Sequence, residues 1–252
     1  MKSAFEYALA LRSKLHAIPE PSGREVNTKK LLMTELAEAC EVHDCGPWFY
    51  AVHREDGAEG TICFRADMDA VCGENGAVYH GCGHDGHMSV VAALARELAG
   101  KRLNRNLIFL FQHAEETGQG ALEASEIFER EQIDAIFGFH NCPGFPAGAI
   151  LLREGVFACA SSGLVLTFNG VQSHAAYPEN GKNPVFPMAA LLSQLAQAAD
   201  PHSYQGMTLV TPVGVSAGER AFGVAAGHGE ICLTLRAWYD QDLERLEAAI
   251  WD

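Results

Sequence analysis

The chain has 252 residues, of which 48% are hydrophobic and 20% charged, and this balance excludes intrinsic disorder as a description of the whole. Its 18 lysines and arginines stand against 32 aspartates and glutamates, which gives a formal net charge of −14. Because so acidic a surface repels phosphate backbones and anionic lipids, we expect neither nucleic acid nor a membrane as a partner.

The first part of the chain predicts two helices followed by alternating strands and helices. A helix is expected over residues 3–17, where Ile18-Pro19 stops it, and a second one begins at the capping-box pair Ser22 and Glu25 and continues to Cys40. Short apolar runs then predict strands at residues 49–52, 61–64, 107–111 and 135–139, with helices near residues 88–99 and 121–130. This alternation predicts an α/β fold with a mixed, mostly parallel sheet flanked by helices.

A different pattern begins near residue 161. A strand, a helix, two strands and a final helix are expected at residues 164–168, 184–199, 208–215, 231–238 and 240–250. This order is typical of an α+β unit, here without a closing strand. We therefore divide the chain into residues 1–160 and residues 161–252.

The cysteines and the N-terminus bear on the location of the protein. Eight cysteines are scattered along the chain, and no apolar run approaches the roughly 20 residues that a membrane-spanning helix needs. Glu6 and Arg12 interrupt any signal-peptide core. The sequence therefore predicts reduced thiols and a cytoplasmic location.

Polar side chains collect where three of the predicted strands end. Asp67 and Asp69 follow the first of these strands, Glu115 and Glu116 follow the second, and His140 follows the third. Between the first two strands lies a glycine-rich loop with the sequence His80-Gly81-Cys82-Gly83-His84-Asp85-Gly86-His87. Because ligands of open α/β sheets bind at the carboxyl ends of the strands, we expect these groups to converge on one rim.

The residue types on this rim predict a hydrolytic metal centre. A thiolate, imidazoles and a carboxylate suit divalent metals of the zinc, manganese and cobalt group. Adjacent glutamates fit such a centre if one binds metal while the other takes a proton from water. The chain contains no paired C-x-x-C knuckles, no G-x-S-x-G elbow and no Walker loop, so a zinc finger, a serine hydrolase and a phosphoryl-transfer enzyme have no motif support.

Five motifs in order resemble the metal-dependent amidohydrolase and aminoacylase branch of the metallopeptidases, which includes hippurate hydrolases and auxin-conjugate hydrolases. The resemblance runs from about Leu11 to Trp238. Its motifs are Arg65-Ala66-Asp67-Met68-Asp69-Ala70, Gly81-Cys82-Gly83-His84-Asp85-Gly86-His87, Phe111-Gln112-His113-Ala114-Glu115-Glu116, Gly138-Phe139-His140 and Ser173-His174-Ala175-Ala176-Tyr177-Pro178.

The resemblance implies a role for individual residues. Two divalent ions, zinc or manganese, would be held by Cys82, His84, Glu116 and His140, with Cys82 bridging them. Glu115 would be the general base, and Asp67 would orient a ligand from behind. His87 is left outside the ligand set. His174 would stabilise the oxyanion, in this family often by reaching across a dimer.

The resemblance also implies an organisation in domains. Residues 1–160 would be the metal-binding catalytic domain, and residues 161–252 a lid and dimerisation domain through which a homodimer forms. Relatives continue past the lid, return to the catalytic domain and supply one more metal-binding histidine. Because this chain ends before that return, we expect an incomplete lid and an incomplete second metal site.

Three functional hypotheses follow. The leading one is a hydrolase that cleaves the amide bond of N-acyl amino acids or related small conjugates. The second is a truncated or degenerate family member that acts as a metal-binding dimeric module without catalysis. The third is a dipeptidase or carboxypeptidase that uses the same site.

Overall fold

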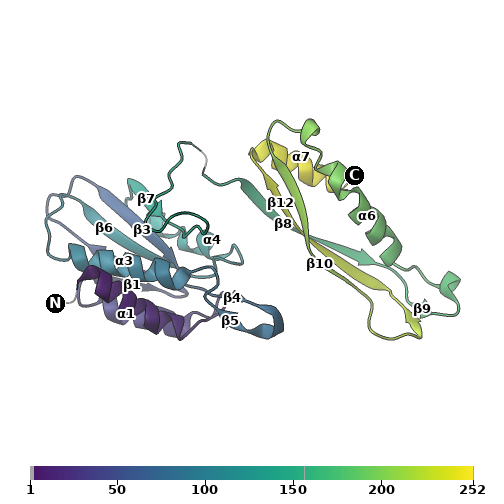
Figure 1. Cartoon of the computed structure of the whole chain (residues 1–252), viewed down its shortest axis with the longest axis horizontal. Coiled ribbons are helices and arrows are strands. Elements are labelled where there is room, and N and C mark those ends of the chain that lie inside the picture. Colours follow the sequence, from purple (N-terminus) through teal and green to yellow (C-terminus); the bar gives the residue numbers. More distant parts are fainter. Residues whose placement is uncertain (1–2, 156, 252) are drawn as a thin grey trace. The chain divides into compact units, whose positions relative to one another are not determined.

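The computed structural model describes residues 3–155 and 157–251, which divide into two units, Met1–Ala147 and Gly148–Asp252 (Figure 1). This division lies between Ala147 and Gly148, earlier in the chain than residue 160, and the assignment of a catalytic and a lid domain stays a prediction. All eight cysteines lie in the described residues, where none of them forms a disulfide.

A five-stranded mixed sheet forms the centre of the first unit, in the order β1-β2-β6-β3-β7. Its strands are β1 (Glu41–Cys45), β2 (Trp48–His53), β3 (Thr61–Asp67), β6 (Asn106–Gln112) and β7 (Ala135–Gly138). The β3 strand is parallel to both of its neighbours, β6 and β7, while β1 and β2 form an antiparallel hairpin whose β2 strand pairs antiparallel with β6. A small hairpin of β4 (Val71–Cys72) and β5 (Val78–Tyr79) lies outside this sheet.

Helices cover both faces of the sheet because successive strand residues point to opposite sides. Phe49 and Ala51 of β2 pack with α1 (Ala4–His16), α2 (Val26–Leu36) and α3 (His84–Leu98). Trp48 and Tyr50 of the same strand pack on the other side with α4 (Gly120–Ala124) and α5 (Ile127–Arg130). The strands are therefore apolar on both faces, which confirms the predicted fold class.

Two of the predicted helix starts are wrong. We predicted that Ser22 and Glu25 form a capping box at the start of α2. Within the described residues, no side chain of this pair makes a cap hydrogen bond to the helix. Instead Glu20 accepts the amides of Asn27 and Thr28 at the start of this helix, at 3.1 and 2.8 Å. The α3 helix begins at His84, inside the stretch that we expected to be a loop.

The second unit follows the predicted order. It contains β8 (Ala160–Asn169), β9 (Ser173–His174), α6 (Val185–Ala198), β10 (Thr208–Ala217), β11 (Val224–Ala225), β12 (His228–Ala237) and α7 (Asp240–Trp251). The antiparallel sheet β10-β12-β8 carries both helices on one face, where Ile231, Leu233 and Leu235 of β12 pack against Leu195 and Leu246. Among residues 3–155 and 157–251, no helix is long and apolar enough to span a membrane.

Gly120, the first residue of α4, allows a test of how closely the main chain packs after β6. A Cβ atom on Gly120 would lie 1.5 Å from the carbonyl oxygen of His113, so Gly120→Ala must displace main chain. We expect the free energy of unfolding to fall by about 2 kcal/mol or more, as overpacking does. Gly163→Ala in β8 is the control, because its Cβ would meet no described atom within 4 Å. Equal urea midpoints for the two variants would contradict the account.

Candidate metal centre

The carboxyl ends of three parallel strands form the rim that the sequence predicted. Asp67 at the end of β3 pairs in register with Gln112 at the end of β6, and β7 ends at Gly138 on the other side of β3. The rim is completed by the first turn of α3. Gly83 precedes this helix in the left-handed conformation, with φ of 89°, and a Cβ there would lie 2.6 Å from Asn141 Oδ1.

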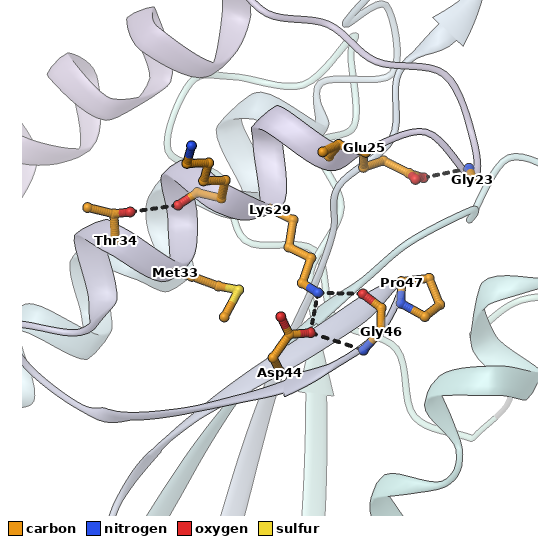
Figure 2. A pocket seen from close by; sticks show the side chains of 10 residues that line it. Gly23, Glu25, Lys29, Met33, Thr34, Asp44, Gly46 and Pro47 are labelled. Carbon is orange, nitrogen blue, oxygen red and sulfur yellow. Dashed lines mark hydrogen bonds and ion pairs between the residues drawn. The ribbon is translucent and has the colours of Figure 1, made fainter.

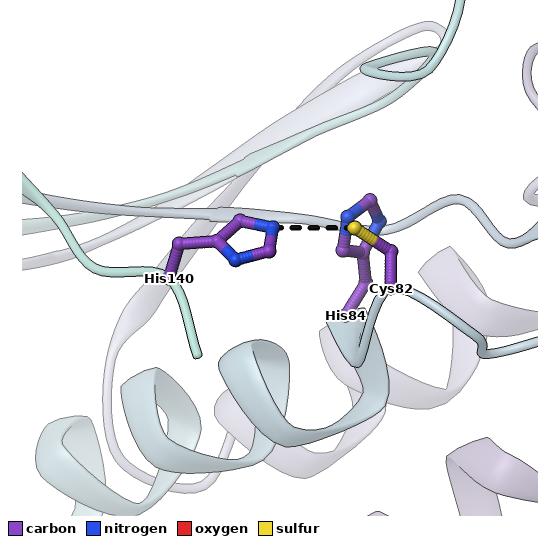
Figure 3. A group of neighbouring side chains, drawn as sticks. All are labelled: Cys82, His84 and His140. Atoms are coloured by element: carbon purple, nitrogen blue, oxygen red, sulfur yellow. Dashed lines mark hydrogen bonds between the residues drawn. The ribbon is translucent and has the colours of Figure 1, made fainter. Parts of the chain in front are cut away.

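Cys82, His84 and His140 bring their ligand atoms together (Figure 3). The Sγ atom of Cys82 lies 3.3 Å from Nε2 of His140, and one ligand atom of each of the three residues lies within 4.8 Å of the others. His84, Glu115 and Glu116 form a second such group. The two groups share His84, so four other side chains lie near its imidazole.

The two ring nitrogens of His84 have opposite surroundings. Nδ1 lies 2.8 Å from the backbone oxygen of Asp69 and 3.2 Å from its Oδ1. Nε2 is buried and has no hydrogen-bond partner among the described residues, although Asp67 Oδ2 and Glu116 Oε1 each lie 3.6 Å away. Buried polar atoms are normally hydrogen-bonded, and a histidine that is fixed through one nitrogen with the other one free is arranged as a metal ligand. The residues therefore fit a divalent cation.

Negative charge dominates the electrostatics of the site. Burial opposes protonation of His84, but the hydrogen bond to Asp69 and the charge of Asp67 outweigh it and raise the pKa of His84 to about 9. Burial together with the hydrogen bond and charge of Glu116 raises the pKa of Cys82 to about 12. Because a bound cation favours the thiolate and the neutral imidazole, a metal ion would reverse both effects.

Two aspartates each hold one histidine of the rim. Asp67 Oδ1 accepts a hydrogen bond from Nδ1 of His87 at 2.9 Å, and Arg65 donates to its other oxygen at 3.0 Å. Burial raises the pKa of Asp67, but the His87 hydrogen bond and the Arg65 charge prevail and hold it well below its usual range. Asp69 is the carboxylate that contacts Nδ1 of His84, and its Oδ2 also accepts the backbone amide of Glu116 at 2.9 Å.

Asp69 was placed on the rim by the sequence but was given no role there, whereas the structure sets it against Nδ1 of His84. A usable signal was present, because Asp67 and Asp69 are two residues apart at a strand end and residues at that spacing share a face of an extended chain. The structure also gives His87 a defined environment between Asp67 and the backbone amide of Asn141, which donates to its Nε2 at 3.1 Å.

His174 lies in the second unit. It belongs to the short strand β9, which pairs with β11, and its Nδ1 accepts the backbone amide of Ala176 at 3.1 Å. Its role as an oxyanion donor stays a prediction.

Known proteins resemble the chain in sequence and in structure. The model of peptidase family M20/M25/M40 matches residues 63–232. An N-acetyldiaminopimelate deacetylase of Exiguobacterium sibiricum is 32% identical over 98% of this chain and 71% of its own length. The Bacillus subtilis YXEP protein, described as a dinuclear metal binding peptidase of the M20 family, is 26% identical with a TM-score of 0.69, over 98% of this chain and 69% of that one.

A crystal structure from methicillin-resistant Staphylococcus aureus supports the fold. It has a TM-score of 0.80 at 23% identity and covers 98% of this chain and 70% of its own. Together with the rim of metal-ligand side chains, these findings define the class of protein, a metal-dependent hydrolase. The chain belongs to peptidase family M20/M25/M40, in keeping with the amidohydrolase branch that its ordered motifs resemble.

Removing the carboxylate of Asp69 tests how the centre is built. Asp69→Ala deletes the group that orients His84 and holds the Glu116 amide, so we expect zinc affinity to fall about 10-fold to 100-fold, as for other partners of metal-binding histidines. Competition with a chelating dye measures this change. The control is Asp134→Ala, because Asp134 accepts the amide of Thr61 at the opposite end of β3. Wild-type affinity in Asp69→Ala would contradict the assignment.

Proposed function

We propose that this chain hydrolyses the amide bond of N-acyl amino acids or related small conjugates. The observation that carries the proposal is the grouping of Cys82, Glu115, Glu116 and His140 with His84, whose buried Nε2 atom has no hydrogen-bond partner among the described residues. The name of the Exiguobacterium relative, a deacetylase of an N-acetylated amino acid, supports this substrate class. We take the substrate to be a small molecule.

Cys82, His84, Glu116 and His140 would hold two divalent ions, zinc or manganese, with Cys82 as the shared ligand. Thiolate, imidazole and carboxylate ligands suit both the charge and the softness of these ions. When bound, such ions polarise a carbonyl oxygen and lower the pKa of water. The dinuclear centre named for the Bacillus subtilis protein supports this stoichiometry.

Glu115 would move the proton. Its carboxylate is partly buried, and burial together with the charges of Asp67 and Glu116 raises its pKa. A carboxylate with a raised pKa is a better proton acceptor. Glu115 would take a proton from the attacking water while the water oxygen bonds to the amide carbon. It would then give this proton to the nitrogen as the carbon–nitrogen bond breaks, releasing a carboxylic acid and an amine.

Asp67 and His174 would assist without carrying the proton. Asp67 would hold the ring of His87 through its hydrogen bond to Nδ1. Its other carboxylate oxygen lies 3.6 Å from Nε2 of His84, so its charge would also act on that nitrogen. His174 would donate a hydrogen bond to the oxygen that becomes negative during attack.

A homodimer through the second unit is part of the proposal. The β8 and β10 strands lie at the two edges of their sheet, and an edge strand offers backbone groups for pairing with another chain. A monomer mass in sedimentation equilibrium would contradict this assembly.

Substitution of the proposed base tests the reaction. In Glu115→Gln we expect the hydrolysis rate of N-acetyl amino acids to fall by about 100-fold or more, because general-base catalysis contributes on this scale. The metal content should stay unchanged. Glu126→Gln, on the surface and paired with Arg130, is the control.

The other hypotheses predict different outcomes of the same assay. An unchanged rate in Glu115→Gln would show that the base is wrongly assigned. A wild-type chain that binds metal and hydrolyses no N-acyl amino acid would favour the non-catalytic module, or a dipeptidase if it cleaves dipeptides.

A further inference from the structure

The segment before α2 carries a buried carboxylate that does not cap the helix. Glu25 is only 5% exposed. Its Oε1 atom accepts two backbone amides, from Gly23 at 3.0 Å and from Ala114 at 2.8 Å. Figure 2 shows Glu25 reaching toward Gly23, while the nearby Lys29 turns to Asp44 and the backbone of Gly46. The lysine is thus engaged elsewhere, and the Glu25 hydrogen bonds in the structure are to main chain.

The amide at Ala114 belongs to a strained turn. Ala114 has φ of 47°, in the left-handed region that residues with a Cβ rarely occupy. It directly precedes Glu115, the proposed base. Such a conformation persists only where the surroundings hold it. Its carbonyl oxygen accepts the amide of Gly120 at 3.1 Å, and its N–H is the group that Glu25 accepts.

The amide on the other side of Glu115 is held in a similar way. The N–H of Glu116 donates to Oδ2 of Asp69 at 2.9 Å, and the hydroxyl of Ser22 donates to the same oxygen at 2.7 Å. The segment before α2 therefore contacts the backbone on both sides of Glu115. Glu25 binds the preceding amide directly, and Ser22 binds Asp69, which accepts the following amide. Neither contact is needed for α2, whose first amides are accepted by Glu20.

We propose that Glu25 is a positioning residue for Glu115. By accepting the Ala114 amide, it holds the left-handed turn that aims the Glu115 carboxylate at the rim. The inference rests on the proposed function, in which Glu115 is the base. According to this inference, position 25 must supply an oxygen that accepts hydrogen bonds, and a negative charge there is not required, because both partners of Oε1 are backbone N–H groups.

Three substitutions separate positioning from general stability. Glu25→Gln keeps an oxygen that can accept both amides, whereas Glu25→Asp keeps the charge but is one methylene too short. Glu20→Ala is the matched control, because Glu20 also accepts two backbone amides but serves α2.

We expect kcat for an N-acetyl amino acid to fall about 10-fold to 100-fold in Glu25→Asp, with KM within about twofold of wild type, since small misplacements of a catalytic group cost this much. Glu25→Gln and Glu20→Ala should stay within about threefold of wild type in kcat.

A second readout works without any hydrolysis. We expect hydrogen–deuterium exchange at the Ala114 amide to accelerate about 10-fold or more in Glu25→Asp and to remain slow in Glu25→Gln and Glu20→Ala, with bound zinc unchanged in all three. If the wild-type chain hydrolyses no amide, the proposed function fails, and exchange at Ala114 still decides whether Glu25 holds the turn. Unchanged exchange in Glu25→Asp would overturn the inference, as would equal losses of kcat in Glu25→Asp and Glu20→Ala.

Discussion

The imidazole of His84 is the group on which the rest of the site depends. Its Nδ1 contacts Asp69, and its buried Nε2 lies near two carboxylates but has no hydrogen-bond partner in the part of the chain that the structure describes. An uncompensated polar atom of this kind is costly in a protein interior unless a ligand satisfies it. A divalent cation held by these residues would supply a partner for the imidazole and would offset the charge of the nearby carboxylates.

The sheet fixes where this imidazole finds its neighbours. Because β3 lies between two strands parallel to it, the chain leaves the sheet at the same edge three times, and each exit carries polar side chains. The α3 helix adds His84 and His87 from its first turn, since Gly83 lets the backbone turn into the helix directly at the rim. The left-handed turn at Ala114 then brings Glu115 and Glu116 back toward His84. Two residues with left-handed backbone conformations, Gly83 and Ala114, therefore lie beside the candidate metal site, and such conformations are common at functional sites.

Much of the fold could be predicted from sequence because apolar runs mark buried strands. The β6 and β7 strands follow such runs, and their carboxyl ends gave the rim without knowledge of the sheet order. The β1 strand was missed because Glu41, His43 and Asp44 give it no apolar pattern. It forms as the partner of β2 in a hairpin at the sheet edge, which is a tertiary effect.

The errors within the site have a common cause, which is that a local pattern can serve a distant partner. Ser22 and Glu25 have the spacing of a capping box, yet Ser22 contacts Asp69 and Glu25 contacts Ala114, at separations of 47 and 89 residues. The glycines around His84 indicated a loop, although the helix begins there because Gly83 supplies only its cap. Residue types and order were therefore enough to indicate the chemistry, while the partner of each polar group required the three-dimensional structure.

The measurement that tests the central claim most directly is the metal content of the purified chain, by elemental analysis without chelator, beside its Cys82→Ser variant. Cys72→Ser is the control, because Cys72 is an exposed thiol in β4. The account predicts zinc or manganese in the wild type and in Cys72→Ser, at two equivalents where the second site holds its ion and at one where it lacks a ligand, and loss of all bound metal in Cys82→Ser, since Cys82 would be shared between the two ions. A wild-type chain without metal, or a Cys82→Ser variant that keeps its metal, would contradict it.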